Sequence, residues 1–242
     1  MTLSKKNIQQ LSLLGVTVFL LVTLTIIGFN KKTAIYDKPI NSQETHSDSK
    51  ADIFALLERF SGSDEKLNGL ISKLKTDSLN LANIKELETI GIVNKTEIFV
   101  AYSRYIQGII ENDDSLLQQS ADLFFEAGTH DPDTLAEKTT YSIYSVRACD
   151  LILKNNPKDM AALTRKATCL VYFNGAVMEG VGLLKEVETL DSNYVQAQHH
   201  LLLLALQSGQ YEKAKKRLKK LLHLQPDNQQ YVDIMTKLET QH

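Results

Sequence analysis

Apolar residues recur at helical spacing through most of the chain, and the pattern is clearest between Asp191 and Pro226. There it predicts one helix over 195–208 and a second over 211–224, because apolar positions three and four residues apart share one helix face. The shared face of the second helix consists of Ala214, Leu218 and Leu221. Gly209 suits a helix end that needs a left-handed residue, and Pro226 cannot continue a helix. This stretch therefore predicts two helices joined by a short turn.

The same offsets recur three more times upstream. The matching sets are Ala101, Tyr105, Gly108 and Asp113; Ser145, Cys149, Ile152 and Pro157; and Gly180, Leu184, Val187 and Ser192. First helices also match, with Leu117, Ala121 and Phe124 in one repeat and Leu163, Ala167 and Leu170 in the next. The final positions of successive sets are 44, 35 and 34 residues apart. The longest interval indicates an insertion of about ten residues, which includes Asp131 and Asp133.

Gly209-Gln210-Tyr211, Ala214, Leu218, Leu221 and Pro226 resemble the second half of a tetratricopeptide (TPR) repeat, a helix–turn–helix unit of 34 residues. The first helix departs from that pattern, since Leu201-Leu202 replaces a large–small pair and the chain has no Trp. The resemblance implies an all-α, TPR-like α-solenoid of stacked helix pairs. We expect a degenerate repeat at 51–78 and repeats at 79–113, 114–157, 158–192 and 193–226, with a capping helix at 228–239.

A membrane anchor is expected near the start of the chain. Leu11–Phe29 contains no charged residue and is long enough to cross a bilayer as a helix. A cleaved signal peptide is the main alternative, but residues 26–30 offer no small-residue cleavage site. Residues 1–10 are then a short tail, and the polar segment 30–50 is a flexible linker. Lysines flank the span on both sides, so the charges do not determine orientation. The layout favours an extracytoplasmic, periplasmic C-terminal domain on a single-pass anchor.

The sequence contains no recognisable catalytic, phosphate-binding or metal motif, so we expect no enzymatic activity, no cofactor and no bound metal. Asp131-Pro132-Asp133 is ordinary turn chemistry, and the adjacent His199 and His200 point about 100° apart on a helix. Cys149 and Cys169 are expected to be small buried residues rather than a disulfide or a metal pair. The net charge of −2 does not favour nucleic acid as a partner.

Two surfaces are candidates for protein binding. TPR arrays resemble one another in binding a peptide or helix on the concave face of their first helices. Helical spacing places Thr164, Thr168, Gln196, His199 and Leu203 on that face here. The chain lacks the Lys and Asn set of the TPR class that binds chaperone tails.

The second candidate is a basic patch made of Lys213, Lys215, Lys216, Arg217, Lys219 and Lys220. It is interpreted either as a solvated outer face or as a docking site for an acidic partner or anionic headgroups. Aromatic residues are not interleaved with these cations, which again disfavours nucleic acid.

Together these features predict a membrane-tethered scaffold or adaptor that binds other proteins. The layout of short tail, single anchor and TPR domain is similar to bacterial accessory proteins of cytochrome c maturation and of the secretion translocon, which implies an accessory or chaperone-like role. Two other classes stay open. One is an enzyme whose site is built across repeats, and the other is a homo-oligomerisation module.

Overall fold

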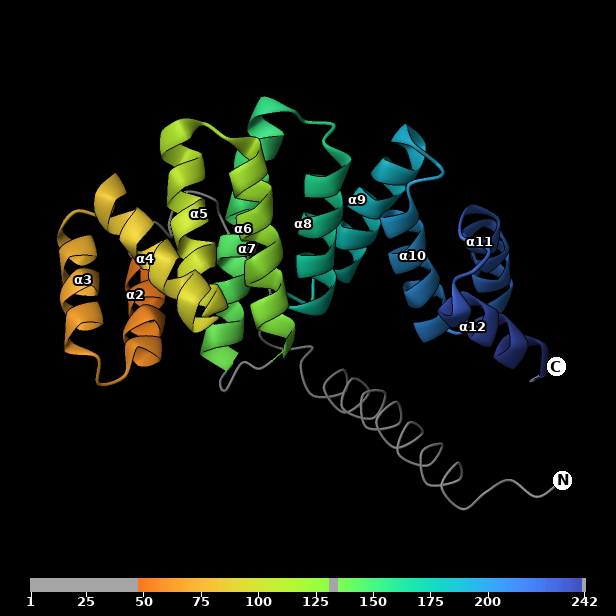
Figure 1. The fold of residues 1–242 in the computed structure, drawn as a ribbon. Coiled ribbons are helices and arrows are strands. Elements are labelled where there is room, and N and C mark those ends of the chain that lie inside the picture. Colours follow the sequence, from red (N-terminus) through yellow and green to blue (C-terminus); the bar gives the residue numbers. More distant parts are fainter. Residues whose placement is uncertain (1–47, 131–134, 241–242) are drawn as a thin grey trace, which may run out of the picture. The chain divides into compact units, whose positions relative to one another are not determined.

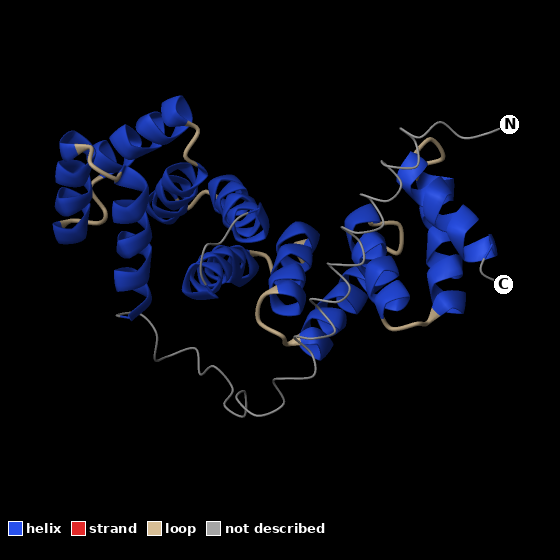
Figure 2. Ribbon diagram, turned by 90° about the horizontal axis from the view of Figure 1, so that it is seen from below, coloured by secondary structure: helices blue, strands red, loops and turns tan. Residues whose placement is uncertain are grey.

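The computed structural model describes residues 48–130 and 135–240, all of which fall in one compact unit, His46–His242. Every regular element of these residues is an α-helix, as Figure 2 shows, so the all-α prediction is confirmed for them. The helices are α2 (Asp48–Ser61), α3 (Glu65–Thr76), α4 (Leu81–Asn94), α5 (Glu97–Glu111), α6 (Asp114–His130), α7 (Leu135–Asn155), α8 (Met160–Tyr172), α9 (Val177–Leu190), α10 (Val195–Gln207), α11 (Tyr211–Leu224) and α12 (Gln229–Thr240).

The predicted tail, the anchor Leu11–Phe29, and linker residues 30–47 lie outside the described residues. Residues 48–50 were predicted to belong to the linker, but they are helical, because α2 begins at Asp48. Asp131 and Asp133 of the predicted insertion also lie outside the description. Of the helices described, none combines the length and the apolar character that crossing a membrane requires.

Helix ends follow local sequence signals. Asp64, Asn80 and Asp159 each precede a helix and accept a hydrogen bond from the backbone N–H three residues later, which satisfies a donor that the helix cannot. Gly209 has φ 70°, so the predicted left-handed residue between α10 and α11 is confirmed.

The buried positions of the helices repeat as the spacing predicts. Ala214, Leu218 and Leu221 are fully buried, and so are Leu184 and Val187 in α9. The corresponding positions in α7, which are Ser145, Cys149 and Ile152, are also buried. In α12, Tyr231 and Leu238 are buried and Ile234 packs against the same cluster, so the three residues face inward as the spacing predicts.

Most helices pack mainly on their neighbours in the sequence (Figure 1). Fewer contacts join α6 with α8 and α8 with α10. Helix α2 is an exception, because it contacts α5 and α7 as well as α3. In the described residues the buried apolar side chains form four clusters that succeed one another from α2 to α12, instead of one central core. The fold is thus held together largely by local helix–helix contacts.

Glycine permits the closest approach within the pair α8 and α9. A Cβ built on Gly180 would lie 2.7 Å from the backbone oxygen of Ala167 and 2.6 Å from Cγ2 of Val171. Gly180 stands where α11 has Ala214, so both helices carry a small residue at the point of contact. Side-chain size at this position therefore sets how near the two helices of a pair can lie.

Candidate functional site

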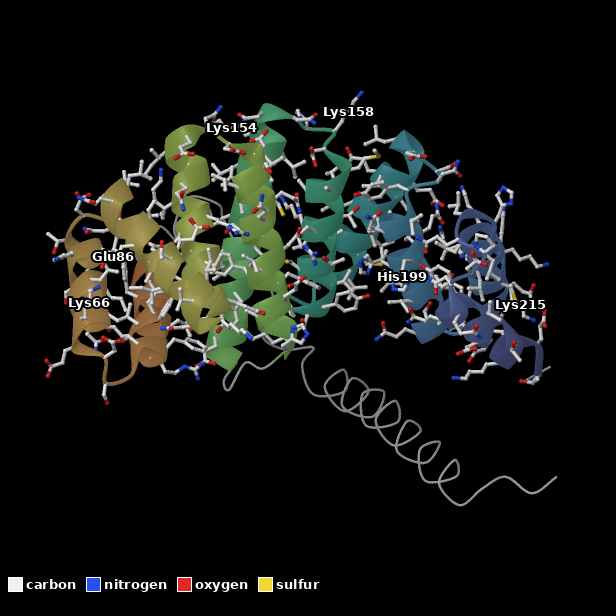
Figure 3. All side chains as sticks on the ribbon, viewed as in Figure 1. Lys66, Glu86, Lys154, Lys158, His199 and Lys215 are labelled. Atoms are coloured by element: carbon white, nitrogen blue, oxygen red, sulfur yellow. The ribbon has the colours of Figure 1, made fainter. Side chains whose placement is uncertain are left out.

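Three of the predicted groove residues lie along one face of α10. Gln196 is exposed, whereas His199 and Leu203 are half-buried. Their spacing of three and four residues aligns them on the helix surface. Figure 3 labels His199 on α10. This face can offer an amide, an imidazole and an apolar side chain to another molecule.

The other two predicted groove residues are not available at the surface. Thr168 is 1% exposed and Thr164 is 6% exposed. Helix α8 contacts α6 and α10 in addition to its sequence neighbours α7 and α9. Both threonines are buried on this closely surrounded helix. The expectation that Thr164 and Thr168 line an open groove is therefore wrong for this part of the molecule.

Aromatic and histidine side chains that spacing alone did not identify lie next to His199. The hydroxyl of Tyr231 on α12 lies 3.1 Å from Nδ1 of His199, and the hydroxyl of Tyr172 on α8 lies 3.4 Å from Nδ1 of His200. The two imidazole rings are 5.6 Å apart between centroids. Two adjacent residues of α10 thus connect it to α8 and to α12. The signal in the sequence that could have identified this group is the pair of adjacent histidines, together with tyrosines on other helices.

Burial keeps these imidazoles neutral. It lowers the pKa of His200 to about 4, and the neighbouring His199 and Arg165 act in the same direction. Burial also lowers the pKa of His199. A neutral imidazole can accept a hydrogen bond from a tyrosine hydroxyl, whereas an imidazolium cannot. The contacts between α10 and its neighbours therefore fit the neutral form.

The folded chain is expected to lose stability as the pH falls from 7 to 5. In the unfolded chain His200 takes up a proton near its ordinary pKa of 6.5, whereas in the folded chain it does so only near 4. The unfolded state therefore gains protons first, and the free energy of unfolding decreases by about 1–2 kcal/mol from this residue. Urea unfolding at the two pH values measures the loss. His200→Gln should remove most of it, while His223→Gln, a change at an exposed position of α11, should not.

A second group of side chains joins α6, α7 and α8. Arg165 pairs with Asp122 (2.7 Å) and stacks over the ring of Phe125 at 4.1 Å. Phe125 packs against Phe173 at 5.1 Å between centroids, and the ammonium of Lys138 lies 5.2 Å from the Phe173 ring. These side chains are only half-buried, and each ring carries a cation over its face, Arg165 over Phe125 and Lys138 over Phe173. The members of this group are distant along the chain, so residue spacing does not predict that they meet.

The basic patch divides into two parts. Lys213, Lys216 and Lys219 are exposed on α11, and Lys220 is partly exposed. Lys215 lies 3.7 Å from Glu212 of the same helix. Figure 3 labels Lys215 on α11.

Arg217 does not belong to the exposed patch. Its guanidinium donates to both carboxylate oxygens of Glu188 on α9, at 2.7 and 3.3 Å, and to Oε1 of Gln198 on α10 at 2.7 Å. Gln198, 1% exposed, in turn donates to Glu188 and to the backbone oxygen of Ser192, both at 2.9 Å. These hydrogen bonds hold the pKa of Glu188 below its usual value. Arg217 therefore connects three helices and differs from the exposed lysines with which the sequence grouped it.

Cys149 and Cys169 are buried and free, as the prediction of small buried residues required. Burial raises the pKa of both thiols, to about 11 for Cys169, so they are protonated at neutral pH. Cys169 also lies 3.2 Å from the hydroxyl of Ser145. In residues 48–130 and 135–240 there is no group of three or more His, Cys, Asp or Glu side chains that could hold a metal ion.

Comparison of the chain with protein-family models and with curated proteins gives no match.

Proposed function

We propose that this protein is a membrane-tethered, TPR-like helical scaffold that binds a peptide or helix of another protein and catalyses no reaction. In this proposal Leu11–Phe29 anchors the chain by a single span, and the helical domain lies outside the cytoplasm. The proposal extends to a role as an accessory subunit of a membrane assembly. Its partner occupies the face of α10 that carries Gln196, His199 and Leu203.

The repeated placement of buried small and large residues in successive helix pairs is the observation that carries this proposal. Such pairs bury their apolar faces against the next pair, and the four successive core clusters fit that arrangement. A surface made by stacked helices is formed before a partner arrives, so binding costs little conformational entropy on the scaffold side. A membrane tether would further raise its effective concentration near membrane complexes.

The face of α10 is the most suitable part of the described surface for such a partner. Gln196 can form hydrogen bonds, Leu203 can bury apolar area, and His199 is held in place by Tyr231. A few residues of this kind supply most of the binding energy in protein interfaces. The half-buried aromatic group around Phe125 and Phe173 could extend the contact towards α6.

Photo-crosslinking in native membranes tests the proposal. A photoreactive side chain at Gln196 or Leu203 of the full chain should form an adduct with one distinct protein. The same side chain at Lys185, which is exposed on α9, is the matched control and should not. Adducts between two copies of this chain only would indicate homo-oligomerisation instead. Protease accessibility of the helical domain in the same membranes reports its side of the membrane.

Alanine substitution then measures the contribution of each position. Gln196→Ala and Leu203→Ala should each weaken capture of the crosslinked protein by about fivefold, which corresponds to roughly 1 kcal/mol. Lys185→Ala should leave capture unchanged. Full capture by both α10 variants would contradict the assignment of this face. Thermal unfolding of each variant checks that a loss of capture does not reflect a loss of folding.

A further inference from the structure

One strongly charged surface of the molecule has no role in the proposed partner site. It consists of Lys213, Lys216, Lys219 and Lys220 on α11, which we call the lysine stripe. Its first three members are three residues apart and Lys220 adjoins the third, so the stripe runs along the side of α11 away from its buried face. That buried face consists of Ala214, Leu218 and Leu221.

No carboxylate of the described residues forms an ion pair with a stripe lysine, although the charge of Glu188 acts on Lys220 from beyond ion-pair distance. Lys213 donates to the amide oxygen of Gln210, an uncharged group. In the described part of the chain, the ion pairs of α11 are Lys215 with Glu212 and Arg217 with Glu188, and neither involves a stripe residue. Like charges three and four residues apart on a helix repel one another. An anionic surface outside the fold would relieve that repulsion.

We propose that the lysine stripe lies against anionic phospholipid headgroups of the membrane to which the chain is tethered. This inference rests on the membrane tether of the proposed function. It assigns α11 a ligand that is distinct from the protein partner of α10.

The chemistry of the stripe favours lipid headgroups over an acidic protein. Specific protein interfaces concentrate aromatic residues and arginine in a desolvated centre, and lysine is depleted there. The stripe contains only lysine, and the single arginine of α11 is bonded inside the fold. Lysine is a point charge on a flexible stem, which suits contact with mobile headgroups without fixed geometry.

The position of the apolar segment in the sequence supports the same ligand. Eighteen residues, 30–47, separate Leu11–Phe29 from the start of α2 at Asp48, so the connecting chain is short. Once such a segment is inserted, the domain stays near the bilayer surface, and weak attraction by several lysines acts at a high effective concentration.

Lysine acetylation in vesicles tests the proposal with the full chain. The chain is reconstituted in vesicles of phosphatidylcholine alone or with about 30% phosphatidylglycerol, and the acetylation rate of each lysine is measured by mass spectrometry. The stripe should react about fivefold more slowly in the anionic vesicles, and about 0.5 M salt should restore the rate. Lys66, Lys154 and Lys158, exposed on or beside other helices and labelled in Figure 3, provide the reference rates.

Substitutions identify the residues that cause the protection. In K216Q/K219Q/K220Q the remaining Lys213 should lose its protection in anionic vesicles. In K66Q/K154Q/K158Q, which removes the same charge elsewhere, the stripe should stay protected. If the stripe lysines lose their protection from acetylation equally in both variants, only the net charge of the chain matters and the proposal is overturned.

The other outcomes separate the stripe from the tether. If the chain floats with both kinds of vesicle but the stripe reacts equally in them, the lipid contact is refuted and the tether stands. Flotation with anionic vesicles alone would support the stripe and refute the tether, and flotation with neither would refute both. Protection by an added polyglutamate peptide, with none in anionic vesicles, would assign the stripe to an acidic protein and refute the lipid contact.

Discussion

Gly180→Ala is expected to destabilise the folded chain by about 1–3 kcal/mol, although alanine is the better helix former. The new methyl group would meet the backbone oxygen of Ala167 at 2.7 Å and Cγ2 of Val171 at 2.6 Å. A side chain can rotate away, but a backbone oxygen can move only if α8 and α9 separate. The loss of packing along that contact then outweighs the gain in helix propensity. Urea unfolding monitored by circular dichroism measures the change.

Gly182→Ala is the matched control for this prediction. Gly182 is two residues further along α9, and a Cβ built there has no neighbouring atom within 4 Å. This variant should therefore show only the higher helix propensity of alanine over glycine, which adds about 0.5–1 kcal/mol to the free energy of unfolding. Equal stability of the two variants would contradict the conclusion that α8 and α9 lie in close contact at Gly180. The pair of measurements thus tests the contact that the repeat pattern implies.

Arg217→Met is expected to cost about 1–3 kcal/mol of stability, because it removes the guanidinium and retains most of the aliphatic stem. At the junction of α9, α10 and α11, the amide oxygen of Gln198 would lose its donor. The carboxylate of Glu188 would lose both hydrogen bonds from the guanidinium and keep the one from the amide of Gln198. Gln198 is the more severely affected partner, since it is almost fully buried. Glu188 is partly exposed, so water can replace some of the hydrogen bonds that its carboxylate loses.

Lys216→Met is the control, because Lys216 neighbours Arg217 in the sequence and is exposed. Its stability should change by less than about 0.5 kcal/mol. A double-mutant cycle with Glu188→Gln then isolates the pair, and the second substitution should cost less once Arg217 is absent. Additive effects would show that Arg217 and Glu188 do not interact in solution.

The sequence alone determined the helices and most of their buried faces. Ala214, Leu218 and Leu221 are buried, and Gly209 adopts the left-handed conformation, as the pattern predicted. These features depend on the 3.6-residue period of a helix and on the preferences of single residues at helix ends, both of which are local. They could therefore be predicted without knowledge of which helices meet.

Only the tertiary structure decided which polar side chains reach solvent. Thr164 and Thr168 were expected to be as accessible as His199 and Leu203, but they are buried on α8, which contacts α6 and α10 as well as its sequence neighbours. Arg217 looked like its lysine neighbours, yet Glu188 lies 29 residues away in sequence and within hydrogen-bond distance in space. Such outcomes depend on distances between helices that are remote in the chain. The spacing of residues within one helix contains no information about those distances.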